Sequence, residues 1–169
     1  MRFAKRAVDE EIKLVEVKIG ALIMDPNTNT PIVVLKGVDS ETVLPIWVGA
    51  FEANAIALEI EKIVPQRPMT HDLLRNLILE CNLSASRVVI TDLLENTFYA
   101  RIELNDPEGE PMSMDSRPSD AIALALRLDC PIFVKQSVLD LSASSNPLDS
   151  DPSSEDVAPA GEDWPDLIA

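Results

Sequence analysis

The hydrophobic pattern of this chain switches from a strand-like to a helix-like period twice, in the same order both times. Apolar residues first alternate, as in half-buried strands, and from Ala50 they recur at helical spacing until Pro65. After a second helical stretch the alternation returns, and another helix follows Asp115. The expected strands are LVEVKIGALIM, PIVVLKGV and TVLPIWVG in the first half, SRVVITDL, TFYARIEL and EPMSMDS in the second, and a final PIFVK. This order predicts an α+β fold.

The two halves match under a shift of 66 residues. The shift lays ANAIALEI (53–60) on SDAIALAL (119–126), so that the run AIAL meets an identical run. We therefore predict duplicated β-β-β-α units with a linking helix over 70–82 and a largely antiparallel or mixed sheet. Chance similarity between two alanine-rich helices is the alternative. We expect Thr70 to cap the linking helix, whose apolar face carries Leu73, Leu74, Leu77 and Ile78.

The composition changes after residue 140. Residues 141–169 contain seven Asp or Glu and no Lys or Arg, and they are rich in Ser, Pro and Ala. Such a segment buries too little apolar surface to offset its chain entropy. We therefore expect a folded domain over 12–140 and a disordered acidic C-terminal tail over 141–169. The apolar residues between Trp164 and Ile168 suggest a protein partner that docks there; a purely solubilising tail is the alternative.

Charge and cysteine content indicate which ligands and which cellular compartment suit the protein. The net charge is −15, of which −8 falls in residues 1–140, so long-range repulsion disfavours non-specific sliding on DNA. Cys81 and Cys130 are isolated thiols without motif spacing, which is typical of a reducing, cytoplasmic protein. No apolar stretch reaches the roughly 20 residues that a membrane span needs, so no membrane association is expected.

The segment DSRPSD (115–120) places charged residues directly before an apolar helix. Helix capping accounts for part of it, because Ser116 can cap, Pro118 suits the first turn, and Asp120 complements the helix dipole. Capping does not account for Asp115 and Arg117. These two residues either pair with each other or serve a functional site.

A second polar cluster is PQRPMTHDLLRNL, which carries His71, the one histidine of the chain. His71 is a candidate general base, and the alternative is a surface histidine bonded to Asp72. One histidine and two distant cysteines make a zinc site of the usual kind improbable. The chain has no P-loop, Rossmann glycine pattern, nucleophile elbow or RNA-binding aromatic motif.

Four blocks resemble the bifunctional nuclease family, in the order found there: LPIWVGAFEANAIALEIEK (44–62), RPMTHDLL (67–74), NTFYARI (96–102) and DSRPSDAIALA (115–125). The resemblance covers about residues 12–138. It implies an α+β fold with internal duplication and the hydrolysis of both RNA and DNA.

A nuclease with this acidic character needs cations to hold a polyanion. We expect Mg²⁺ or Mn²⁺ bound by Asp115 and Asp120, with His71 as general base or water-orienting residue. Arg67, Arg117 and Ser119 are the expected substrate-binding residues. The alternative is a non-catalytic, homo-oligomeric module that binds proteins through exposed apolar edges, for example near Trp47. The two differ in one observable: the nuclease scheme needs His71 within about 6–8 Å of Asp115 or Asp120 in an open cleft.

Overall fold

A computed structural model describes residues 12–145, which form seven strands and four helices. The strands are β1 (Leu14–Met24), β2 (Pro31–Gly37), β3 (Val43–Trp47), β4 (Ser84–Leu94), β5 (Thr97–Asn105), β6 (Pro111–Ser116) and β7 (Ile132–Lys135). The helices are α1 (Ala50–Ile60), α2 (Thr70–Glu80), α3 (Pro118–Leu128) and α4 (Gln136–Ser145). The α+β class expected from the sequence is confirmed.

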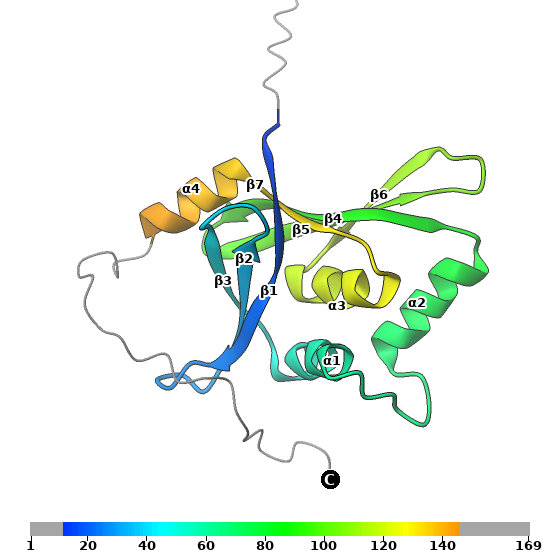
Figure 1. Cartoon of the computed structure of the whole chain (residues 1–169), viewed down its shortest axis with the longest axis horizontal. Helices are drawn as coiled ribbons and strands as arrows, with labels where there is room; N and C mark the ends of the chain where they lie inside the picture. Colours follow the sequence, from blue (N-terminus) through cyan, green and yellow to red (C-terminus); the bar gives the residue numbers. More distant parts are fainter. Residues whose placement is uncertain (1–11, 146–169) are drawn as a thin grey trace, which may run out of the picture.

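All seven strands belong to one sheet with the order β3-β2-β1-β7-β4-β5-β6. Every neighbouring pair is antiparallel except β4 and β7, which are parallel. The short strand β7 therefore joins the two groups of three strands, pairing with β1 on one side and with β4 on the other. A single sheet thus runs through both halves of the chain, and it curves around α1 and α3 (Figure 1).

Both halves contain three antiparallel strands followed by a helix, with the first strand innermost and the third at the edge. The first residues of β2 and β5, Pro31 and Thr97, lie 66 positions apart, as the shift predicts, and the first residues of α1 and α3, Ala50 and Pro118, lie 68 positions apart. The duplication itself stays a prediction.

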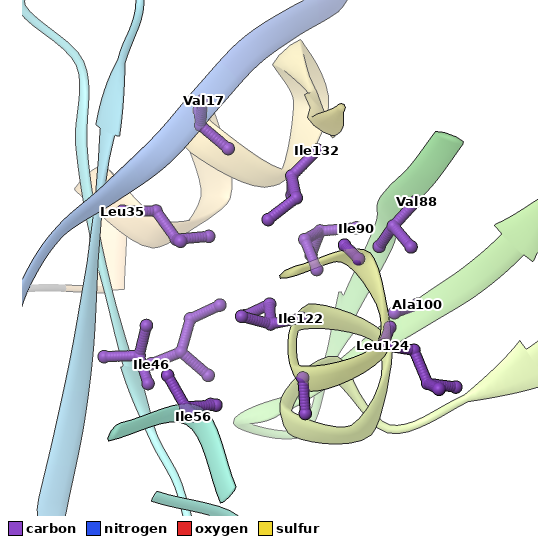
Figure 2. Close-up of a cluster of buried hydrophobic side chains, with 14 of the residues drawn as sticks. Val17, Leu35, Ile46, Ile56, Val88, Ile90, Ala100, Ile122, Leu124 and Ile132 are labelled. Atoms are coloured by element: carbon purple, nitrogen blue, oxygen red, sulfur yellow. The ribbon is translucent and has the colours of Figure 1, made fainter. Parts of the chain in front are cut away.

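Helix α3 lies at the centre of the molecule. It contacts β4 and β5 of the sheet on one side and helices α1 and α2 on the other (Figure 1). Its residues 121–125 are all buried, and small alanines alternate there with larger side chains. Figure 2 shows Ile122 between side chains from both halves of the sheet, among them Leu35, Ile46 and Ile90. The core therefore joins the two halves around one helix.

Helix α2 is less buried than its sequence indicated. Of the four residues on its apolar face only Ile78 is buried, whereas Leu73, Leu74 and Leu77 are exposed. Thr70 is not the cap either. The helix begins after Met69, whose backbone N–H donates to the Asp72 carboxylate at 2.9 Å, so an acid of the first turn satisfies the helix start.

Helix α4 was not expected from the sequence. It runs to Ser145 and therefore crosses the domain boundary predicted at residue 140. Val138 and Leu139 on this helix are buried in the core. The proposed docking segment Trp164–Ile168 lies outside the described residues. Within residues 12–145, no helix combines the length and the apolar character needed to cross a membrane.

Candidate active site

A cleft of about 790 Å³ lies where α1, α2 and α3 meet strands β5 and β6. Most of its wall is apolar, and a cluster of charged residues occupies part of it. The lining includes Phe51, Glu52, His71, Leu74, Leu77, Ile78, Ile102, Leu104, Met114, Asp115, Arg117, Asp120, Leu124 and Arg127. The beginnings of α1, α2 and α3 all contribute residues to this lining.

The start of α3 carries two of the charged side chains. Arg117 is the N-cap residue and Pro118 the first helical residue, a position that suits proline because its missing N–H would have no partner there. Ser116 is not the cap, contrary to expectation. It ends β6, and its hydroxyl donates to the backbone oxygen of Arg117 at 2.9 Å. The extended backbone of Arg117 turns the chain from strand into helix.

Asp120 connects two partners from different parts of the chain. Its Oδ1 lies 2.8 Å from Nε2 of His71, and its Oδ2 accepts from Nε of Arg117 at 2.7 Å. Partial burial acts to raise the pKa of Asp120, but the hydrogen bonds from Arg117 and His71 outweigh it, so the pKa is lowered. Asp120 is therefore an ionised carboxylate at neutral pH with both oxygens engaged.

The partner of His71 determines which ring nitrogen is free. An ionised carboxylate only accepts hydrogen bonds, so Nε2 of His71 carries the proton that points at Asp120. In the neutral ring, Nδ1 is then the nitrogen with an available lone pair. The side chain of His71 is mostly buried and lines the cleft. Asp120 thus contacts His71 in the same way as the carboxylate contacts the ring in a histidine–carboxylate dyad.

Arg117 lies between two carboxylates. Besides Asp120, it contacts Glu52 of α1, whose Oε1 accepts from Nη2 at 3.0 Å. The hydrogen bonds to Asp120 and Glu52 raise the pKa of Arg117, and its side chain is still 65% exposed. Among the hydrogen bonds of residues 12–145, none involves Nη1 of Arg117. The guanidinium is held in place and keeps donors for a further ligand.

Comparison with known proteins places this arrangement in a family. The profile of the bifunctional nuclease domain matches residues 33–147, which includes every charged residue of the cleft described above. The chain belongs to the bifunctional nuclease domain family.

Relatives of this nuclease-family domain occur in bacteria and plants. "Uncharacterized protein Rv1829" of Mycobacterium tuberculosis is 39% identical over 136 residues, which is 80% of each chain. "Bifunctional nuclease 1" of Oryza sativa subsp. japonica is 29% identical over 63% of this chain and 33% of its own length. "Bifunctional nuclease 2" of the same rice is 30% identical over 64% of this chain and 34% of its own length. The chain thus spans about a third of the rice proteins that it matches.

The nuclease-family domain brings some predicted site residues together and leaves others apart. His71, Asp115, Arg117 and Asp120 all line the cleft. Arg117 pairs with Asp120 and Glu52, not with Asp115. Arg67 is exposed and does not line the cleft, and Ser119 is buried within α3 at 7% exposure. The fold therefore brings neither Arg67 nor Ser119 to this site.

The predicted metal ligands do not form a complete site in the protein alone. Across residues 12–145, no three His, Cys, Asp or Glu side chains are grouped so that they could hold a metal ion. Both oxygens of Asp120 are engaged, by His71 and Arg117. Asp115 is exposed at the cleft and is the one predicted ligand whose carboxylate remains available. A single carboxylate suits an ion that takes its other ligands from substrate phosphates and water.

The sequence reading missed two charged residues of the cleft, Glu52 and Arg127. Arg127 is almost fully buried, with a side chain 4% exposed, and joins three helices. It donates to Asp72 of α2 at 2.8 Å and to the backbone oxygens of Ala55 in α1 and Ala123 in α3. A helix-offset comparison could have found Glu52, because it is the third residue of α1 as Asp120 is the third residue of α3.

Proposed function

We propose that this domain hydrolyses phosphodiester bonds of RNA and DNA in the cleft, with the His71–Asp120 pair as its catalytic base and Arg117 as its phosphate-binding residue. The contact between Nε2 of His71 and Oδ1 of Asp120 carries the proposal, because it joins two segments 49 residues apart in sequence at an open cleft. Membership in the bifunctional nuclease domain family supports the same reaction class.

In this proposal His71 removes a proton from the attacking water. The lone pair of Nδ1 accepts that proton while Asp120 holds the ring through Nε2 and stabilises the imidazolium that forms. The water oxygen bonds to phosphorus, the bond from phosphorus to the leaving oxygen breaks, and this oxygen takes a proton from solvent. Arg117 offers its remaining N–H donors to the phosphate oxygens, where negative charge increases in the transition state.

The charge of the cluster supports a role for a divalent cation. The cleft lining carries three negative charges, on Glu52, Asp115 and Asp120, against two positive charges, on Arg117 and the buried Arg127, so its net charge is negative and repels a phosphodiester. Mg²⁺ or Mn²⁺ held by Asp115 together with the substrate would neutralise this charge. The metal requirement and its identity remain predictions.

A test measures hydrolysis of labelled RNA and DNA by purified protein, with Mg²⁺, with Mn²⁺ and with EDTA. We expect Arg117→Lys to lower turnover while melting changes little, because lysine keeps the charge but loses the planar fork. We expect His71→Ala to remove activity, and Asp115→Asn to weaken the dependence on divalent ions. Arg67→Lys is the matched control: the same exchange, made at an exposed arginine outside the cleft, leaves turnover unchanged.

The competing function is the non-catalytic, homo-oligomeric binding module. The exposed leucines of α2 favour it, because monomers rarely present such surfaces without a role. Retained hydrolysis in folded His71→Ala protein contradicts the catalytic assignment of His71. If Arg117→Lys, His71→Ala and Asp115→Asn all lose stability while the folded fraction keeps its activity, the charged residues of the cleft stabilise the fold and do not catalyse hydrolysis.

A further inference from the structure

The apolar wall of the cleft presents side chains that the domain itself leaves uncovered. Phe51, at the start of α1, is 88% exposed, and it is the one aromatic residue that lines the cleft. Leu77 of α2 and Met114 of β6 also line it, with 57% and 46% of their surface exposed. Covering such side chains with an apolar ligand is favourable, by roughly 25 cal/mol per Å² of apolar surface removed from water.

The polar and apolar parts of the cleft suit different parts of one ligand. Phe51 is the immediate sequence neighbour of Glu52, which accepts a hydrogen bond from Arg117, so an exposed aromatic ring lies next to the residue that holds the phosphate-binding arginine. A nucleotide has the same division, because its phosphate is charged and the faces of its base are apolar. Base faces stack on aromatic side chains in proteins that bind single strands.

Size and charge disfavour a double helix as the ligand of this cleft. A volume of about 790 Å³ lies within the range of pockets for small molecules, roughly 300–1,000 Å³. In a duplex the base faces are stacked on one another and are not available to an apolar wall. Duplex binding also depends on neutralising many phosphates with lysine and arginine, whereas this chain has a net charge of −15. Stacking does not need a basic surface.

We infer that the cleft selects unpaired nucleotides: one base of a single strand packs against Phe51 and Leu77 while the adjoining phosphate contacts Arg117. The substrate class is therefore single-stranded RNA and DNA, together with unpaired loops and ends. The inference rests on the proposed function for the reaction but concerns binding, so the two are tested by different measurements.

The experiment measures the binding of a fluorescein-labelled DNA dodecamer to the full-length protein by fluorescence anisotropy. The phosphorothioate form of the strand is used so that hydrolysis does not distort the titration. Phe51→Ala is expected to weaken binding roughly 5- to 100-fold, the range for losing one base–aromatic contact. Leu77→Ala weakens it in the same direction.

The same helix offers a matched control. Leu73 is 63% exposed, close to the value for Leu77, but it does not line the cleft. Leu73→Ala should therefore change the dissociation constant by less than about twofold, as surface substitutions away from a site do. Annealing the dodecamer to its complement, or replacing its bases by abasic sites, should remove most of the binding.

Four results would overturn the inference. They are equal affinity for the duplex, equal affinity for the abasic strand, equal loss with Leu73→Ala and Leu77→Ala, and a change of molecular mass by light scattering in the Phe51→Ala or Leu77→Ala protein. The last result assigns the apolar wall to contact between copies of the chain. Selective binding of the single strand without hydrolysis of its natural phosphodiester form supports the inference and contradicts the proposed nuclease activity.

Discussion

The buried pair Asp72–Arg127 leads to a prediction about stability that depends on which partner is removed. We expect Asp72→Asn to destabilise the fold more than Arg127→Met. Arg127 is 4% exposed, so without Asp72 its charge has no anionic partner and little access to water. Asp72 is 25% exposed, so without Arg127 its carboxylate is partly hydrated and still accepts the backbone N–H of Met69. The asymmetry follows from burial alone.

The magnitudes follow from the same contacts. Breaking a buried ion pair by removing one partner costs about 3–5 kcal/mol. Two backbone oxygens still accept from Arg127 in Asp72→Asn, and Asp72 is not fully buried, so we expect about 2–3 kcal/mol. Arg127→Met replaces the charge by an apolar side chain and should cost about 1 kcal/mol. For a chain of this size these values lower Tm by about 5–10 °C and about 2–4 °C.

Urea and thermal unfolding of the two single variants and the double variant at neutral pH measure these values. The double variant should have about the same free energy of unfolding as Arg127→Met, because once the arginine is absent there is no buried positive charge for Asp72 to compensate. A larger loss with Arg127→Met than with Asp72→Asn would refute the reasoning. It would mean that packing of the arginine stem, and not compensation of its charge, stabilises the contact between α1, α2 and α3.

Three further predictions concern the pH dependence, the Glu52 contact and the C-terminal residues. Burial raises the pKa of Asp72, but the hydrogen bonds from Arg127 and Met69 outweigh it and the pKa is lowered. The stability that Asp72 contributes is therefore fully present above its ordinary pKa, about 4, and is lost as the pH falls through its pKa in the folded protein. The free energies of unfolding of wild type and Asp72→Asn should therefore converge as the pH is lowered. A difference that stays constant with pH contradicts this. Gly49→Ala should keep Tm within a few degrees yet lower turnover, because the Cβ of the alanine would collide with the Glu52 carboxylate that holds Arg117. If Gly49→Ala acts only by displacing Glu52, its effect and that of Glu52→Gln are not additive in the double variant, and additive losses of turnover would contradict this explanation. Removal of 146–169 should also leave Tm within a few degrees, because α4 ends at Ser145 and the described core lies before it; a collapse of cooperativity counts against this.

The sequence predicted features that depend on neighbouring residues. The alternating and helical periods located the strands and three of the helices, and Pro118 marked the first residue of α3. Helix α4 was missed because QSVLDLSASS is dense in serine, which favours turns and caps over helix interiors. Its burial of Val138 and Leu139 against the sheet outweighs that weak local preference.

Contacts between residues far apart in sequence could not be predicted from the sequence. The sequence placed Asp120 at a helix start and in one candidate site with His71, but it did not show that the two side chains are in direct contact across 49 positions. Glu52 reaches Arg117 across 65 positions and Arg127 reaches Asp72 across 55. Nothing in a local pattern encodes such pairs, because they depend on how α1, α2 and α3 pack. The sequence located the polar clusters, and the packing of the helices determined their partners.

The starts of α1 and α3 carry residues in corresponding places. With the helix starts superposed, Glu52 and Asp120 occupy the same third position, and Gly49 and Arg117 the same N-cap position. An acid in the first turn is favourable in any helix. The arginine at the N-cap is what differs, and both acids bind it. The first-turn acids of both helices thus meet at the one arginine, and the glycine at the start of α1 leaves room for the Glu52 carboxylate beside it.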